Sequence, residues 1–102
     1  MKLGKIVGTV VSTQKDEKVE GLKFYLVRDL TLDMQEKDSF IVAADAMGAG
    51  VGEVVLYATG SSARMTKMTD KRPCDAVVMA IVDILEIGGE TLYLKNPAPG
   101  QG

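Results

Sequence analysis

The residues most able to do chemistry lie in the middle of the chain, around three glycines at alternate positions. The segment runs from a strand-like stretch through Asp45, Gly48, Gly50 and Gly52 to Glu53. A glycine-rich loop can hold phosphate groups, but a dinucleotide-binding loop needs the pattern G-x-G-x-x-G between a strand and a helix. Here the spacing is G-x-G-x-G, and a β-branched strand follows. The pattern therefore favours a structural role, in which the glycines permit positive φ or close backbone approach.

Serine and cysteine side chains offer candidate nucleophiles at two further places. Ser61 and Ser62 follow Gly60 just before a predicted short helix, and Cys74 is the single cysteine of the chain. A nucleophile of either type is usually activated by a neighbouring base, and the chain contains no histidine. A lysine base stays formally open for the two serines. We expect no catalytic residue at these positions.

Acidic residues give little support to a metal site or to an acid–base pair. With one cysteine and no histidine, a metal ion would have only carboxylate ligands, and the acidic residues show no calcium-loop spacing. Asp45 and Glu53 could form an acid pair of the glycosidase type, but a domain of 102 residues offers little room for a substrate cleft. We therefore predict no metal, no cofactor and no enzymatic activity.

The composition indicates one ordinary globular domain. The chain is 46% hydrophobic and 25% charged, and its longest apolar run, residues 76–82, is far below the roughly 18 residues that span a bilayer. The first residues lack the pattern of a signal peptide, and a single cysteine fits a reducing compartment. A formal net charge of −2 without a basic stripe disfavours nucleic acid as a partner. We expect a cytoplasmic protein that binds neither membranes nor nucleic acid.

The elements expected around the glycine loop are short β-strands. Runs rich in Val, Ile, Thr and aromatic residues predict strands at 3–13, 22–28, 40–44, 54–59, 76–87 and 91–95. Gly4 and Gly8 suggest that the first strand bends. A short helix is expected from Ser61 or Ser62 to Met68, and the polar run 33–38 reads as a loop. The fold class is therefore all-β, with a small barrel of the oligonucleotide-binding type as the leading architecture.

A barrel of this type can bind single-stranded nucleic acid when aromatic side chains stack bases in a basic groove. The five aromatic residues lie instead within apolar strands, where a core or interface role is favoured: Phe24, Tyr25, Phe40, Tyr57 and Tyr93. The surplus of apolar residues favours self-assembly.

Five segments, taken in order, resemble the EutN/CcmL family, the pentameric vertex proteins of bacterial microcompartments. They are LGKIVGTVV (3–11), EGLK (20–23), ADAMGAGVGEVVL (44–56), GSSAR (60–64) and residues 75–83. The resemblance spans residues 3–83 without a large gap. It implies that residues 1–95 form one vertex-protein domain. Residues 96–102, rich in Pro and Gly, are expected to be a flexible tail by their composition.

The resemblance implies a five-stranded barrel, a homopentamer, and a place at the five-fold vertices of a polyhedral shell whose faces are tiled by hexameric shell proteins. It also implies that small residues of the glycine loop approach one another near the five-fold axis: Gly48, Ala49, Gly50 and Gly52. Glu53 would then be a candidate for polar contacts near that axis. An edge segment would contact a neighbouring subunit or a hexamer through Ser61, Ser62 and Arg64. The C-terminal strand, expected at 91–95, would be exchanged with the adjacent subunit.

Overall fold

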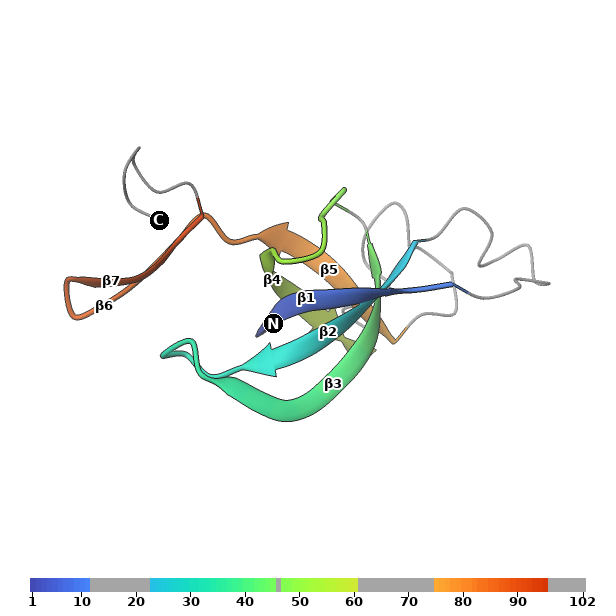
Figure 1. Ribbon diagram of the computed structural model, residues 1–102, viewed down its shortest axis with the longest axis horizontal. Helices are drawn as coiled ribbons and strands as arrows, with labels where there is room; N and C mark the ends of the chain where they lie inside the picture. The colour runs from blue at the N-terminus through green and yellow to red at the C-terminus, as the bar shows by residue number, and fades with distance from the viewer. Residues whose placement is uncertain (12–22, 46, 61–74, 96–102) are drawn as a thin grey trace.

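The computed structural model describes residues 1–11, 23–45, 47–60 and 75–95 of the 102-residue chain. These residues form seven strands: β1 (Lys2–Val10), β2 (Phe24–Leu30), β3 (Glu36–Asp45), β4 (Val54–Thr59), β5 (Ala76–Ile81), β6 (Ile84–Ile87) and β7 (Glu90–Leu94). The first five close into a barrel, whereas β6 and β7 form a separate two-stranded sheet (Figure 1). The predicted all-β fold with a five-stranded barrel is confirmed. The predicted helix from Ser61 or Ser62 to Met68 and the tail 96–102 lie outside the described residues.

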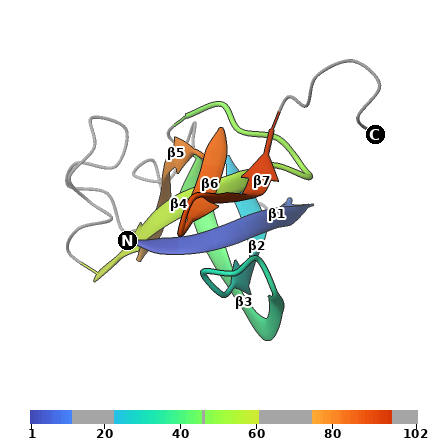
Figure 2. The same ribbon diagram turned by 90° about the vertical axis from the view of Figure 1, so that its left-hand side faces the viewer.

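The barrel follows the order β1-β2-β3-β5-β4 and is closed by one parallel pairing. β1 is antiparallel to β2 and to β4, and the pairs β2–β3 and β4–β5 are also antiparallel. β3 and β5 run parallel over a short stretch, where Ala44 pairs with Val77 and Asp45 with Val78. Figure 2 views the molecule from the end at which β6 and β7 lie across the barrel strands. The barrel is thus closed at the Ala44–Val77 and Asp45–Val78 pairs, near the C-terminal end of β3.

β1 shows why glycine is needed in this barrel. A Cβ atom on Gly4 would lie 2.4 Å from Val27 Cγ1 and 3.2 Å from Tyr57 Cε1, so a larger residue cannot fit without displacing the core. The register between β1 and β2 shifts between Ile6 and Gly8. Such a bulge bends a strand, which fits the curvature expected from the sequence.

β3 begins earlier than the sequence pattern indicates. The strand starts at Glu36 rather than near Phe40, because Leu30 pairs with Glu36 across a tight turn. In that turn the Thr31 N–H donates to Gln35 O at 2.9 Å. The expected loop over 33–38 is therefore wrong for residues 36–38: their polar side chains are exposed, but their backbone belongs to the sheet.

The segment 76–87, predicted as one strand, forms two strands, β5 and β6. The Val82 N–H donates to Val54 O at 2.8 Å and so still belongs to the barrel. One residue later, Asp83 O accepts a hydrogen bond from the Lys95 N–H at 2.9 Å. The chain thus leaves the barrel between residues 82 and 83, where its hydrogen-bonding partner changes.

The core lies inside the barrel and continues at the end from which β6 and β7 project. Alternate residues of the five barrel strands fill the interior, among them Ile6, Tyr25, Val27, Ala43, Val55, Tyr57 and Val78. A second cluster, Leu3, Leu30 and Val54, receives Leu85 and Tyr93 from the last two strands. We call β6 and β7 the C-terminal ribbon. One face of the ribbon is anchored to the barrel while its turn extends away (Figure 1).

Candidate functional site

The glycine loop, residues 47–53, connects β3 to β4 and is fixed by the buried carboxylate of Asp45. Asp45 Oδ1 accepts hydrogen bonds from the backbone N–H groups of Met47 at 2.9 Å, Gly48 at 3.0 Å and Ala49 at 3.4 Å. A short acidic side chain that accepts from the following N–H groups stabilises a tight turn. Asp45 therefore positions the loop, and this role accounts for its burial better than acid–base chemistry does.

The same loop is tied to β1 and β2. The buried Tyr25 hydroxyl donates to Ala49 O at 2.7 Å. Two backbone hydrogen bonds join the loop to β1: the Gly52 N–H donates to Ile6 O at 2.8 Å, and the Ile6 N–H donates to Glu53 O at 2.9 Å. Ala49 is consequently buried, so it supports the loop from inside.

Glu53 is held by two interactions within its own chain. Its Oε1 accepts from the Gly50 N–H at 2.6 Å, and its Oε2 lies 3.0 Å from Lys95 Nζ. The bond from Lys95, followed by that from Gly50, lowers the pKa of Glu53, and the bond to Glu53 raises the pKa of Lys95. The carboxylate therefore points toward the end of the C-terminal ribbon, an orientation that the sequence pattern leaves open.

The three glycines of the loop serve two different purposes. Gly48 and Gly52 have φ of +73° and +94°, values that favour glycine, and nothing lies within 4 Å of a Cβ built on either. Gly50 does not have a left-handed backbone, but a Cβ there would lie 3.3 Å from Glu53 Oε1. Gly48 and Gly52 make the turn, and Gly50 leaves room for the carboxylate.

The outer surface of the loop is apolar. Val51 is 60% exposed and Met47 about half exposed, and the glycines that follow each of them in the chain, Gly52 and Gly48, are also exposed. Neither side chain was predicted as a site residue, although the sequence contains a signal: two large apolar residues within a loop rich in glycine. The loop therefore presents small and apolar groups rather than charges.

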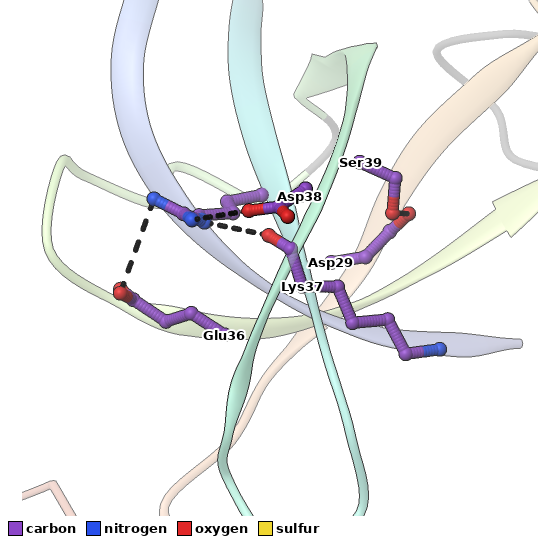
Figure 3. A network of polar contacts seen from close by, with 6 residues as sticks. Asp29, Glu36, Lys37, Asp38 and Ser39 are labelled. Carbon is purple, nitrogen blue, oxygen red and sulfur yellow. Dashed lines mark hydrogen bonds and ion pairs between the residues drawn. The ribbon is translucent and has the colours of Figure 1, made fainter.

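A second group of polar contacts joins β2 to β3 (Figure 3). Arg28 Nε donates to Lys37 O at 2.7 Å. The Arg28 guanidinium also lies 3.4 Å from Asp38 Oδ1 and 3.9 Å from Glu36 Oε2. Its central carbon lies 5.3 Å from the centre of the Phe40 ring. The side chain is thus held flat against the outside of the barrel. These contacts stabilise the pairing of β2 with β3, and we assign no chemical role to Arg28.

Asp29 is the other acceptor in this group. The Ser39 hydroxyl donates to Asp29 Oδ2 at 2.6 Å, and the Tyr57 hydroxyl donates to Asp29 Oδ1. Burial raises the pKa of Asp29, but the two hydrogen bonds and nearby lysines outweigh burial and leave the pKa below its ordinary value. Burial, and then the bond to Asp29, raises the pKa of Tyr57 above its ordinary range. Asp29 therefore joins Tyr57, in the barrel core, to Ser39 on β3.

A cleft of about 620 Å³ lies beside these contacts, between the barrel, the turn after β2 and the ribbon. Its lining includes Lys5, Arg28, Leu30, Gly52 and Tyr93. Within the described ranges there is no group of three or more His, Cys, Asp and Glu side chains suited to hold a metal ion. Among the same residues, no helix is long and apolar enough to cross a bilayer. Ser61, Ser62 and Arg64 lie outside the part of the chain that the structure describes.

The structure is that of a small closed β-barrel protein, with a hydrogen-bonded glycine loop and a projecting two-stranded ribbon. The family model described as ethanolamine utilisation protein EutN/carboxysome matches residues 1–83. The chain is 42% identical over 96 residues to the carboxysome shell vertex protein CcmL of Gloeobacter violaceus, covering 94% of this chain and 96% of that one. This protein therefore belongs to the EutN/CcmL family, as the resemblance implied.

Solved structures agree with this assignment. The structure of Gloeobacter violaceus CcmL superposes with a TM-score of 0.89 at 42% identity, covering 93% of this chain and 98% of that chain. A GrpN pentameric microcompartment shell protein from Rhodospirillum rubrum gives a TM-score of 0.78 at 44% identity, covering 85% of this chain and 99% of that chain. Both the sequence and the fold therefore match shell proteins over nearly their full length.

Proposed function

We propose that this protein is a structural shell protein of a bacterial microcompartment, in which homopentamers cap the five-fold vertices. The observation that carries the proposal is the match, over 94% of this chain and 96% of the relative, to a carboxysome shell vertex protein with the same fold. The protein acts in the cytoplasm as part of the shell. Its partners are copies of itself and the hexameric shell proteins of the flat faces.

The mechanism is geometric. A flat sheet of hexagons cannot close, and a pentagon at each corner introduces the curvature that closes the polyhedron. A ring of five identical chains is held by head-to-tail contacts, in which each copy offers two different complementary surfaces. The protein works by shape, and we assign it no catalytic step.

The exposed surface of the glycine loop supports the proposal that this loop lies near the five-fold axis. Its exposed surface consists of two glycine backbones and two apolar side chains, so five copies can approach closely without repulsion between charges. The Glu53 carboxylate stabilises the loop, because one of its oxygens accepts a hydrogen bond from the Gly50 N–H and the other pairs with Lys95 Nζ. Ser61, Ser62 and Arg64 remain our candidates for contacts with a neighbouring subunit or a hexamer.

The mass of the native particle tests the proposal directly. Native mass spectrometry is expected to show five copies of the chain, and a stable monomer would contradict the vertex function. Co-expression with a hexameric shell protein is expected to give closed polyhedral particles. Omission of this protein is expected to leave open sheets or tubes.

Val51→Asp tests the position of the loop. If five loops converge, the substitution places five carboxylates close together, and the pentamer is expected to dissociate or to require high salt. Leu32→Asp is the matched control, because Leu32 is an exposed leucine in the turn after β2 and not in the glycine loop. An unchanged pentamer in the Val51 variant would show that the loop lies elsewhere in the ring.

A further inference from the structure

Two positively charged side chains lie side by side on the outer surface of the barrel. Lys5 of β1 pairs in register with Arg28 of β2, and directly opposite side chains point to the same face of a sheet. Ile6, the next residue of β1, is fully buried in the core, so Lys5 faces outward because side chains alternate along a strand. Two like charges in this position repel each other and destabilise the strand pair.

The two charges differ in their partners. The Arg28 guanidinium lies 3.4 Å from Asp38 Oδ1 and 3.9 Å from Glu36 Oε2, so acidic residues of β3 offset its charge. Lys5 has no ion pair and no side-chain hydrogen bond with any residue that the structure describes. The Lys5 ammonium is therefore the charge of this pair that an external anion would neutralise.

Lys5 and Arg28 both line the cleft of about 620 Å³ between the barrel, the turn after β2 and the ribbon. This volume lies within the range of about 300–1,000 Å³ that is typical of small-molecule sites. The turn contributes Gln35 to the lining, and the ribbon contributes Tyr93. Within the described ranges, neither the Gln35 side-chain amide nor the Tyr93 hydroxyl has a hydrogen-bonding partner. Both groups can donate to a ligand.

The lining of the cleft indicates the kind of ligand that fits. It contains two basic residues and one acidic residue, Glu36, so one positive charge is in excess. Leu30, Met34 and Val54 add apolar side chains. A carboxylate accepts hydrogen bonds on both oxygens and can therefore bind an ammonium group and a neutral donor together. A ligand with one carboxylate and a short apolar body matches these groups.

We propose that the cleft binds a small monocarboxylate. The carboxylate pairs with the Lys5 ammonium and accepts a further hydrogen bond from the Tyr93 hydroxyl, while the apolar part lies against Leu30 and Val54. The added negative charge relieves the repulsion between Lys5 and Arg28. The vertex function requires no such ligand, and every residue of this site comes from one chain.

Butyrate is a suitable probe, and butyramide is its uncharged counterpart of nearly the same size. Saturation-transfer NMR on the wild-type particle, at constant ionic strength, measures the dissociation constant of each compound. Butyrate is expected to bind at least about tenfold more tightly, because only the carboxylate gives Lys5 a charged partner. Equal affinities, or no binding of butyrate up to about 100 mM, would overturn the ligand site.

Lys5→Met keeps most of the side-chain length and removes the ammonium group. This variant is expected to weaken butyrate binding about tenfold and to leave butyramide binding unchanged. Lys2→Met is the matched control, because Lys2 is exposed on the same strand and does not line the cleft. The control makes the same change in net charge and is expected to alter the affinity by less than about twofold. An equal loss in both variants would indicate unspecific attraction and contradict the site.

Tyr93→Phe removes only a hydroxyl group and tests the second donor. It is expected to weaken butyrate binding about threefold, and an unchanged affinity would remove Tyr93 from the site. Circular dichroism and native mass spectrometry show whether each variant keeps the fold and the assembly of the wild type. If Lys5→Met does not, Lys5→Gln takes its place in the same measurement.

Inorganic phosphate distinguishes a carboxylate site from a site for another anion. Binding of phosphate that depends on Lys5, without binding of butyrate, would show that the carboxylate class is wrong. A wild-type pentamer that binds no butyrate would overturn the ligand site and leave the vertex function standing. A wild-type monomer that binds butyrate through Lys5 would do the reverse.

Discussion

Glu53 and Lys95 join the glycine loop to the end of the C-terminal ribbon. Glu53 Oε2 lies 3.0 Å from Lys95 Nζ, while Oε1 accepts from the Gly50 N–H. The backbone of Lys95 donates to Asp83 O and so closes the base of the ribbon. One carboxylate therefore links the glycine loop to the base of the C-terminal ribbon.

Lys95→Met is expected to loosen the ribbon without unfolding the barrel. The substitution keeps most of the side-chain length and removes the charge that holds Glu53. Hydrogen exchange should become faster at the amides of β6 and β7, while those of β1 to β5 stay protected. Lys23→Met provides the control, because Lys23 is exposed and makes no ion pair within the described structure. Equal exchange in the two variants would argue against the link.

The Glu53–Lys95 pair also predicts a dependence on pH. Because the pKa of Glu53 is lowered in the folded protein, its carboxylate contributes to folding stability above its pKa in the unfolded chain, roughly 4.3. That contribution is lost as the pH falls through the pKa of the folded state. The raised pKa of Lys95 keeps the contribution in place below roughly 10.4, and it is lost as the pH rises through the folded value. The difference in melting temperature between wild type and Lys95→Met should therefore be constant near neutral pH and shrink below about pH 4. A difference that persists in acid would contradict the ion pair.

Asp45→Ala is expected to destabilise the protein by about 3 kcal/mol, because it leaves the N–H groups of Met47, Gly48 and Ala49 without their acceptor. Asp45→Asn keeps an acceptor oxygen and should cost about half as much. Urea unfolding at one fixed protein concentration measures both, because assembly makes stability depend on concentration. A loss below about 1 kcal/mol for the alanine variant would show that the loop does not depend on this carboxylate.

Gly4→Ala and Gly8→Ala form a matched pair on β1. The new methyl group at residue 4 meets Val27 Cγ1 at 2.4 Å and Arg28 O at 3.1 Å, so we expect a loss of about 3 kcal/mol or failure to fold. The methyl group at residue 8 meets nothing closer than 3.9 Å and should change stability by no more than about 0.5 kcal/mol. Thermal unfolding should separate the two variants by about 10 °C or more. Similar melting temperatures would contradict the close packing at Gly4.

Asp29→Asn should make the folding stability depend less steeply on pH in acid. Because the folded pKa of Asp29 is lowered, its contribution is present above the unfolded value of roughly 3.9 and is lost as the pH falls through the folded value. Unfolding followed between about pH 5 and pH 2 should show a shallower slope in the variant. Tyr57→Phe removes one donor to this carboxylate and is expected to cost about 1–2 kcal/mol at neutral pH. Parallel pH profiles for wild type and Asp29→Asn would argue against the role of Asp29.

Local patterns predicted much of the fold because they record local constraints. Runs rich in Val, Ile, Thr and aromatic residues predicted the barrel strands. The glycine pattern predicted positive φ or close backbone approach, and the structure has positive φ at Gly48 and Gly52. The start of β3 at Glu36 was missed, since a polar run reads as a loop whenever its backbone partner is unknown. Leu30 supplies that partner from the preceding strand.

The sequence by itself determined the all-β class, the turn-forming glycines and membership of the EutN/CcmL family, because these depend on residue types at fixed spacings. Only the tertiary structure decided where residues 76–87 divide, what Asp45 holds and which way Glu53 points. The division of 76–87 and the direction of Glu53 each depend on a contact with a segment whose position is set by strand register, namely Val54 for Val82 and Lys95 for Glu53. The contacts of Asp45 are local, but the residue types alone do not show which N–H groups it accepts from. Register arises from packing across the whole barrel, and a short run of residues does not contain it.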